Sequence, residues 1–210
     1  MIGWCKSPPF LFKIDMALRR TTDPASEPIT TAEAKAHLRV DWSDDDTIID
    51  LYITAAREFC EEYTNRGFIT QTWTQDDNSF GTHIELKRNP VVSVTSVKYY
   101  DENESQQTWS SGNYQVDNKS DVGGIYPAAN KDFPSISSET ILPVETIYVV
   151  GYGAASDVPE KIKQAIKIMV SYFYENREMV NVPMTSMGTS TPIPNTVYVL
   201  LNPYRVRHFG

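Results

Sequence analysis

The fold is decided by residues 43–67, which read SDDDTIIDLYITAAREFCEEYTNRG. Two apolar columns recur in this stretch at spacings of three and four residues, the period of a helix that buries one face. Arg57 and Glu61 fall on the opposite face, where we expect solvent. Ser43 and the three aspartates after it predict the helix start, and Gly67 predicts a left-handed residue at its end. The columns are Ile48, Tyr52, Ala55, Phe59 and Tyr63, beside Ile49, Ile53, Ala56 and Cys60.

Further helices are predicted on both sides of this one. Thr30 and Glu33 have the spacing of a capping box, which predicts a short helix ending near Leu38. Asp157-Val158-Pro159-Glu160 starts a second long amphipathic helix that runs to about Arg177. A short helix over residues 196–201 follows a proline-rich loop. Burial of about 1.5–3 kcal/mol for each large apolar side chain should pair the two long helices as a helical base.

Between the long helices the pattern changes to that of strands. Residues 68–153 are rich in β-branched and aromatic side chains, interrupted by Gly, Pro, Asn and Asp. Residues 83–87 alternate polar with apolar, as a half-buried antiparallel strand does. Residues 117–143 are rich in polar residues and proline, and we expect a long loop there. The predicted strands are 68–74, 83–87, 91–100, 108–109, 113–116 and 146–152.

The sequence therefore predicts an α+β fold in which an antiparallel β segment is inserted into a helical base. Residues 1–28 are expected to form an extended N-terminal arm. Residues 29–178 form the central domain, with the helical base at 29–67 and 157–178 and the β insert at 68–153. Residues 179–210 form a C-terminal tail that contains the short helix. Trp4, Phe10 and Phe12 make the arm too apolar for a linker, so we expect it to cover its own domain or a neighbour.

Composition excludes several classes of protein. With 210 residues, 40% of them hydrophobic, the chain can bury a core and is not expected to be disordered. No apolar run of about 18 residues predicts a membrane span, and the N-terminus does not resemble a secretory signal. The net charge of -8 argues against general DNA binding. Beyond Glu178 the only fixed charges are Arg205 and Arg207, so a basic tail could dock on an acidic neighbour.

Candidate catalytic groups do not assemble into a known pattern. His37, His83 and His208 lack the spacing of metal ligands, and the two cysteines, Cys5 and Cys60, form neither a disulfide framework nor a metal set. The aspartates at 44–46 are explained by helix capping. No nucleotide-binding loop or nucleophile elbow is present. We therefore expect no enzyme, no cofactor and no metal.

The order of these motifs resembles the head–tail connector, or head completion adaptor, proteins of tailed phages. The resemblance covers roughly residues 29–70 and 157–206. The β insert fits only longer members of the family, and the N-terminal arm matches none of it. It rests on residues 29–41, ITTAEAKAHLRVD; on Asp44-Asp45-Asp46; on residues 53–64, ITAAREFCEEYT; and on 159–166, 174–178 and 200–206, which read PEKIKQAI, YENRE and LLNPYRV.

The resemblance implies a structural protein of the virion neck, made in the host cytoplasm. Such adaptors form a ring, expected to be dodecameric, beneath the portal protein. The ring extends the channel for double-stranded DNA, which passes without specific binding, and gives a platform to the next neck or tail-completion protein. Portal contact would fall on the C-terminal segment Pro203, Tyr204, Arg205, Val206 and Arg207. The arm lies outside the resemblance, and from its apolar character we expect Trp4, Phe10 and Phe12 to contact neighbours in the ring.

Two other readings stay open at this point. The chain could be a neck stopper or tail-completion protein, or its β segment could be a carbohydrate-binding module on a virion. The flanking helices argue against a pure lectin-like sandwich. A nuclease or hydrolase would need a carboxylate pair at a metal, and the acidic pairs here are adjacent in sequence and ordinary.

Overall fold

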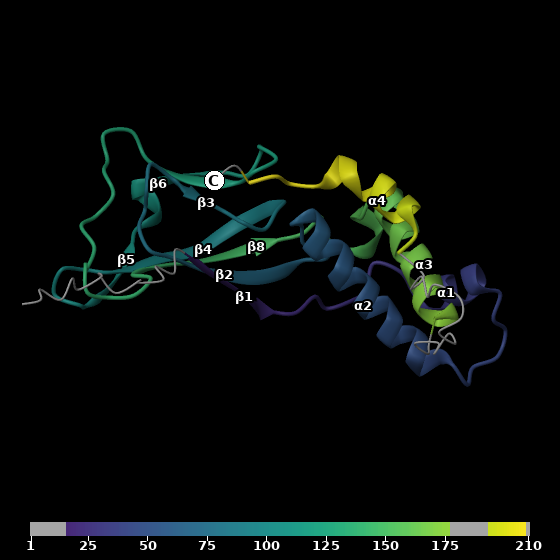
Figure 1. The fold of residues 1–210 in the computed structure, drawn as a ribbon. Coiled ribbons are helices and arrows are strands. Elements are labelled where there is room, and N and C mark those ends of the chain that lie inside the picture. The colour runs from purple at the N-terminus through teal and green to yellow at the C-terminus, as the bar shows by residue number, and fades with distance from the viewer. Residues whose placement is uncertain (1–15, 177–192, 209–210) are drawn as a thin grey trace, which may run out of the picture.

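The computed structural model describes residues 16–176 and 193–208. The molecule is elongated, with the β strands at one end and the helices at the other (Figure 1). The helices are α1 (Thr31–Leu38), α2 (Asp46–Thr64), α3 (Glu160–Glu175) and α4 (Asn195–Leu201). The α+β class predicted from the sequence is confirmed.

The two long helices pack on each other as predicted. One hydrophobic cluster joins α1, α2, α3 and α4, so the helical base has a single core. Cys60 is fully buried within it, and desolvation raises the pKa of its thiol to about 12. Its fully buried members on the three larger helices are Ile49, Ile53, Ala56 and Cys60 from α2, Ile162, Ala165, Ile166, Met169 and Val170 from α3, and Val197 and Leu201 from α4.

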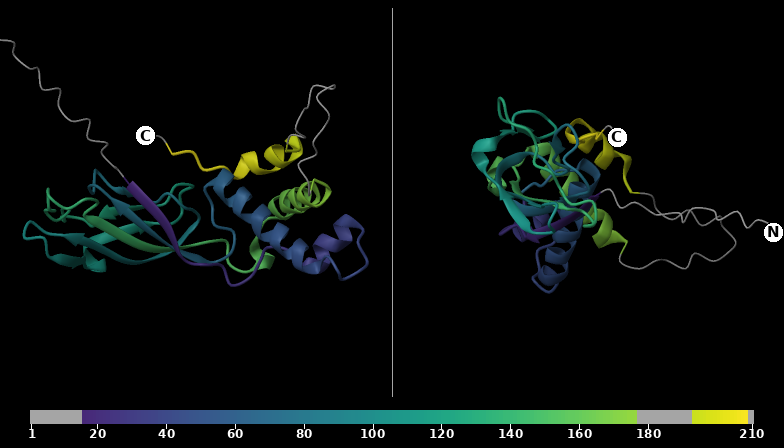
Figure 2. Two further views of the ribbon diagram at one scale, coloured as in Figure 1. Left: turned by 60° about the horizontal axis from the view of Figure 1, so that its bottom comes forward. Right: turned by 90° about the vertical axis from the view of Figure 1, so that its left-hand side faces the viewer.

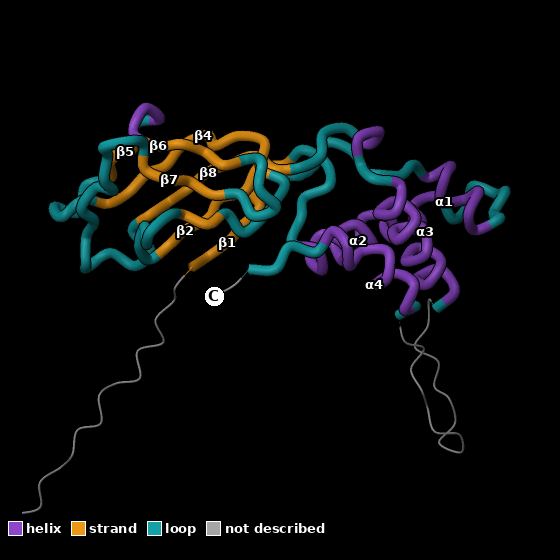
Figure 3. Tube along the Cα trace, turned by 90° about the horizontal axis from the view of Figure 1, so that it is seen from above, coloured by secondary structure: helices purple, strands orange, loops and turns teal. Residues whose placement is uncertain are grey.

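The β segment forms two sheets (Figure 3). The larger, with antiparallel neighbours throughout, runs β1 (Met16–Thr22), β2 (Gln71–Asp77), β8 (Val144–Val150), β4 (Val91–Tyr100) and β5 (Gln106–Trp109). The smaller sheet runs β3 (Ile84–Glu85), β7 (Gly124–Pro127) and β6 (Tyr114–Asp117). A second core cluster draws on both sheets, with Tyr148 fully buried in its centre and Phe80 stacked on Phe133 at 4.7 Å between ring centroids.

Part of the predicted N-terminal arm is a strand of the larger sheet. Residues 16–22 form β1, which pairs with β2 in an antiparallel register from Met16 opposite Asp77 to Thr22 opposite Thr72. Two consecutive arginines interrupt the alternation of apolar and polar side chains in this stretch. For this reason its sequence pattern does not predict a strand. Residues 16–28 therefore belong to the folded domain. The prediction of an extended arm over residues 1–28 is wrong for these residues.

The ends of α2 also differ from the prediction. Ser43 does not cap the helix through its side chain; Asp45 occupies the N-cap position, and the Ser43 carbonyl accepts a backbone hydrogen bond from Asp46 at 3.1 Å. The left-handed residue at the other end is Asn65, with φ 55°, and not Gly67. Gly67 is required for space instead, because a Cβ there would lie 2.7 Å from the Val150 side chain.

The stretch predicted as a long loop, 117–143, contains a strand. Gly124 begins β7, which pairs with β3 on one side and β6 on the other. Glycine was taken as a turn signal here, but the strand passes close to a neighbour: a Cβ on Gly123, just before it, would lie 2.5 Å from the side chain of Val91. Glycine in a strand often marks such a close approach.

The shared core of the helical base predicts a large effect of truncation at its centre. Met169→Ala removes a fully buried side chain of α3 and should lower the free energy of unfolding by about 2–5 kcal/mol. Leu51→Ala on α2, where Leu51 is 60% exposed, is the matched control and should change it by less than about 0.5 kcal/mol. Urea denaturation followed by circular dichroism measures both. Equal effects of the two substitutions would contradict the packing of α2 on α3.

Candidate interaction surface at the C-terminal strap

The C-terminal segment lies across the junction between the helical base and the β segment. Residues 202–208, here called the strap, leave α4 through a short 3₁₀ helix, Asn202–Tyr204, and continue in extended form. In Figures 1 and 2 this yellow segment runs from the helices back toward β3. The strap thus brings the C-terminal residues that were predicted to bind a partner onto one surface.

The strap is held by the C-terminal end of α2. The Val206 amide donates to the Thr64 carbonyl at 2.9 Å, and the Asn65 side-chain amide donates to the Val206 carbonyl at 3.2 Å. Arg66 Nε donates to the Tyr204 carbonyl at 2.6 Å. Val206 is only 3% exposed. The strap is therefore a fixed part of the fold as far as Val206.

Beyond Val206 the strap reaches the smaller sheet. His208 Nδ1 lies 2.5 Å from Glu85 Oε1 on β3, and Lys87 Nζ lies 3.0 Å from the same oxygen. Burial works against ionisation of Glu85, but hydrogen bonds from Lys87 and His208 outweigh it and lower the pKa of this carboxyl. The strap thereby connects the helical base to the β segment by contacts at both of its ends.

The predicted portal-contact residues divide into an anchored set and an exposed set. Val206 is buried and Tyr204 is half-buried, whereas Pro203, Arg205 and Arg207 are exposed. This alternation is expected of extended chain, in which successive side chains point to opposite sides. The Arg205 guanidinium lies 5.0 Å from the centre of the Tyr63 ring, which gives it a cation–π contact.

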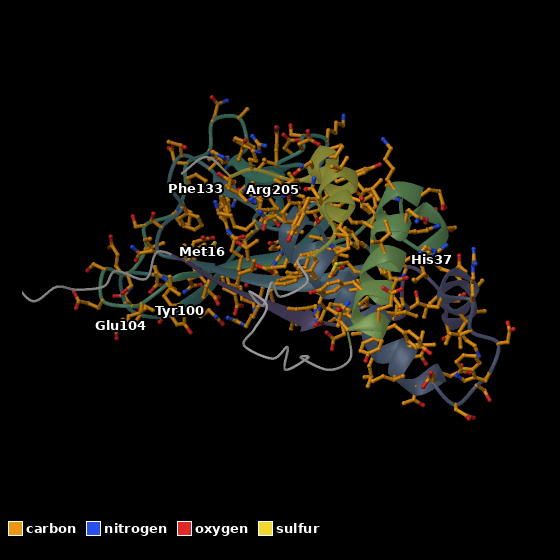
Figure 4. All side chains as sticks on the ribbon, turned by 45° about the vertical axis from the view of Figure 1, so that its right-hand side comes forward. Met16, His37, Tyr100, Glu104, Phe133 and Arg205 are labelled. Atoms are coloured by element: carbon orange, nitrogen blue, oxygen red, sulfur yellow. The ribbon has the colours of Figure 1, made fainter. Side chains whose placement is uncertain are left out.

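Figure 4 marks Arg205 near the middle of the molecule, between His37 at the helical end and Glu104 at the tip of the β segment. Arg205, Val206, Arg207 and His208 line a shallow groove with Asn65, of about 440 Å³. The strap therefore displays two cations on a surface that its own backbone hydrogen bonds hold in shape.

A buried ion pair on α2, with its partners from other segments, joins the two halves of the molecule. Arg57 and Glu61, on successive turns of α2, are 3% and 4% exposed and pair at 2.8 Å between Nη1 and Oε2. Arg57 Nε also donates to Glu27 at 2.8 Å. Glu61 accepts hydrogen bonds from the Phe68 amide at 2.8 Å and from Gln71 Nε2 at 2.7 Å. These contacts fix the chain where it passes from α2 into β2.

Burial raises the pKa of Glu61 above its ordinary value, and the positive charge of Arg57 and the hydrogen bonds of Phe68 and Gln71 only partly oppose this. A second arginine completes the junction. Arg88 Nη1 donates to the Glu61 carbonyl at 3.0 Å, its other terminal nitrogen pairs with Glu62, and its guanidinium stacks 4.7 Å from the centre of the Trp73 ring.

Sequence reasoning placed Arg57 and Glu61 on the solvent face of α2, and that prediction is wrong. The helical period locates them correctly opposite the column of Ile48, but a helix whose end abuts a sheet has a second buried side. The partners Glu27, Gln71 and Arg88 come from other parts of the chain, so the local pattern carries no signal for this burial. Only the i, i+4 spacing of Arg57 and Glu61 indicates an ion pair.

The other candidate residues are scattered or lie outside the described part of the chain. Trp4, Phe10 and Phe12 fall outside the described residues. His37 is exposed on α1, and His83 stacks on Tyr126 at 4.8 Å between ring centroids. Within residues 16–176 and 193–208 no three His, Cys, Asp or Glu side chains gather as metal ligands, and no helix there combines the length and apolarity needed to cross a bilayer.

A family model for head completion proteins matches residues 27–207, from the segment that precedes α1 to the end of the exposed arginine pair on the strap. The chain belongs to the head completion protein family. The family match includes β2 to β8 and the strap as far as Arg207, whereas β1 lies outside it. A search of curated proteins gives no significant match.

Solved structures agree with this fold. A chain from the "Neck of empty GTA particle computed with C6 symmetry" superposes with a TM-score of 0.72 at 22% sequence identity, covering 92% of this chain and 98% of that one. A chain from the "Neck of native GTA particle computed with C12 symmetry" gives the same values. A chain from the "Virion of native gene transfer agent (GTA) particle" has a TM-score of 0.72 at 21% identity, with coverages of 92% and 97%. At this identity the likeness establishes the fold of the head completion protein.

The buried pair predicts a pH-dependent loss of stability when it is broken. Arg57→Ala removes the nearest cation of the buried Glu61 carboxylate, leaving only Arg20 Nη1, at 3.8 Å, among its ion-pair partners in the described residues, and should cost about 3–5 kcal/mol. The raised pKa of Glu61 will rise further, so protonation at low pH relieves the penalty, and the loss should be larger near pH 8 than near pH 5. Denaturant titrations at both pH values test this, with Lys161→Ala, an exposed cation on α3, as control. A loss independent of pH would show that Glu61 is not the group affected.

The anchoring of the strap predicts that Val206 controls its opening. Val206→Ala removes two buried methyl groups, which should lower the stability of the closed strap by about 1–2 kcal/mol. A change of this size makes the open state of the strap roughly tenfold more populated. Cleavage by trypsin after Arg205 and Arg207 should accelerate by that factor. Val199→Ala, at a position 62% exposed on α4, is the control and should leave cleavage unchanged. Unchanged cleavage of Val206→Ala would show that the backbone hydrogen bonds alone hold the strap.

Proposed function

We propose that this head completion protein is a head–tail adaptor of a virion neck. It forms a ring beneath the portal protein, extends the DNA channel, and provides the platform on which the next neck or tail-completion protein assembles. The observation that carries the proposal is the family match over residues 27–207. The fold likeness to chains of GTA necks, one of them computed with C12 symmetry, supports both the place in the particle and the ring.

The strap is the proposed portal contact. Its backbone is fixed by Thr64, Asn65 and Arg66, so the two arginines it displays are presented without a large ordering cost. Arginine is frequent among the residues that dominate protein interfaces. The partner surface that fits this arrangement is acidic, because Arg205 and Arg207 have no acidic partner among the ion pairs of the described residues.

The charge of the rest of the chain suits a channel through which DNA slides. The net charge of the chain is -8, and the two arginines of the C-terminal segment are assigned to the proposed portal contact. The surface left for the channel is therefore acidic. An acidic wall does not displace counterions from the phosphates, so the duplex would pass without being held. Specific DNA binding is therefore not part of the proposed function.

Charge reversal on the strap tests the portal contact. The double variant Arg205→Glu, Arg207→Glu should lose binding to purified portal by at least about 100-fold, since like charges across an interface cost several kcal/mol. The matched control, Lys119→Glu with Lys131→Glu, makes the same change of net charge at two exposed positions of the β segment and should bind normally. Binding is measured by interferometry, and electron microscopy of the complex shows whether a ring lies below the portal.

The outcomes separate the alternatives. A ring below the portal that the strap variant abolishes supports the adaptor. Normal portal binding by the strap variant would remove the strap from the contact. Failure of the intact protein to bind portal, with binding to an already assembled neck, would instead favour a neck stopper or tail-completion protein.

A further inference from the structure

Strand β1 is an open edge of the larger sheet. It is the terminal strand in the order β1-β2-β8-β4-β5, and within residues 16–176 and 193–208 no other strand pairs with its outer side. The register shifts between Arg20 and Thr22, which ends the regular ladder. The free edge is therefore the five residues Met16–Arg20.

This edge lacks the usual protection against pairing with another strand. Natural edge strands are commonly blocked by proline or by charged side chains, and β1 contains no proline. Its two cations are both engaged within the molecule. Arg19 pairs with Asp76 and with Glu145, the latter at 3.3 Å, and Arg20 pairs with Glu58 at 2.7 Å.

An open groove runs beside the edge, between β1, β2 and α2. It measures about 750 Å³. Its lining combines the apolar side chains of Leu18, Phe59 and Trp73 with the charged side chains of Arg20, Glu58, Glu61, Glu62 and Arg88. Two donors in it, Trp73 Nε1 and Arg88 Nε, are buried and have no hydrogen-bond partner in the described structure. Both donors are closed to solvent, so what the groove offers a segment from outside is the apolar part of its lining, where apolar side chains would be removed from water.

The sequence that precedes β1 matches this edge in length and pattern. Residues 10–14, FLFKI, alternate so that Phe10, Phe12 and Ile14 fall on one side of a strand and Leu11 and Lys13 on the other. Five residues equal the length of the free edge. Placed on it, the aromatic side can face the groove beside Leu18, while Lys13 lies on the opposite face with Ala17 and Arg19.

A hairpin within one copy is disfavoured in this register. Pairing of residues 10–14 with residues 16–20 of one chain leaves Asp15 alone to form the turn, and the tightest common hairpin needs two residues. No glycine, asparagine or proline occurs between Phe10 and Thr22 to make a tighter reversal. A second copy can supply the strand in this register without any turn.

We propose that residues 10–14 of one copy add a strand to the Met16–Arg20 edge of β1 in the neighbouring copy, with Phe10 and Phe12 in the groove between β1, β2 and α2. The inference rests on the proposed ring and names the contact that closes it. An arm on one side and an acceptor edge on the other form a heterologous interface, which generates a ring when the rotation closes. Main-chain pairing supplies affinity, and the groove supplies specificity.

Disulfide trapping between two tagged populations tests the contact directly. In a Cys5→Ser background, one population carries Lys13→Cys and the other carries Ala17→Cys. The remaining native thiol, Cys60, is fully buried with a pKa of about 12 and does not react. After assembly on the portal and mild oxidation, the two tags should be joined on a non-reducing gel.

The control pairs Lys13→Cys with Val92→Cys, a 48% exposed position on β4 away from β1. The Lys13–Ala17 pair should give on the order of tenfold more heterodimer, because a docked strand raises the effective thiol concentration to the mM range. Adding Phe10→Ser and Phe12→Ser to the population that carries Lys13→Cys should abolish the excess of heterodimer over the control pair. Adding Leu11→Ser, on the other side of the strand, should leave that excess unchanged. Equal yields for the two pairs would overturn the proposal.

A truncation separates this inference from the proposed function. The chain lacking residues 1–14 keeps the strap and β1, so it should still bind portal but should not form closed rings in electron micrographs. Complete rings of the truncated chain would overturn the arm contact and leave the adaptor role in place. Absence of portal binding by the intact chain would overturn the adaptor role and the arm contact with it.

Discussion

The buried pair of Arg57 and Glu61 is the interaction on which the arrangement of the molecule depends. Two charges that are 3% and 4% exposed are costly to desolvate, and they are tolerated because their remaining polar atoms meet partners from other segments. Those partners are Glu27 ahead of α1 and Phe68 and Gln71 at the entry to β2. The pair therefore sets how the β segment leaves the helical base, and breaking it would leave a charge without compensation where the two halves meet.

The strap extends this junction to the surface. Val206 fills a buried position against the end of α2, and His208 reaches Glu85 on β3, so the chain's last described residues contact both halves. A recognition segment is commonly disordered before it binds, and it then loses affinity to the cost of ordering. Here intramolecular hydrogen bonds supply the order in advance. This chain thus presents Arg205 and Arg207 on a preformed surface.

Much of the fold could be predicted from the sequence, because its main signals are local. The capping box at Thr30 and Glu33 forms as expected, with the Glu33 amide donating to the Thr30 hydroxyl at 3.2 Å, and the apolar columns of α2 pack on α3. What failed depended on contacts outside the local pattern. β1 is defined by its partner β2 and β7 by two neighbours, and the pair of Arg57 and Glu61 is buried by Glu27, Phe68 and Gln71. The strap residues were located from a resemblance, whereas their division into anchored and exposed side chains required the structure.

The order of strands in the larger sheet has a consequence for how the chain folds. β2 lies between β1 and β8, and β8 separates it from β4, so the centre of the sheet cannot form until residues 144–150 have been synthesised. Contacts between segments so distant along the chain form slowly. The chain loses the entropy of the long loop between them before strand pairing compensates for that loss. The helices α1 and α2 emerge from the ribosome early with their core partner α3 still to come. Newly made chains therefore expose apolar surface through most of translation, which makes chaperone binding during synthesis a property to expect of this subunit.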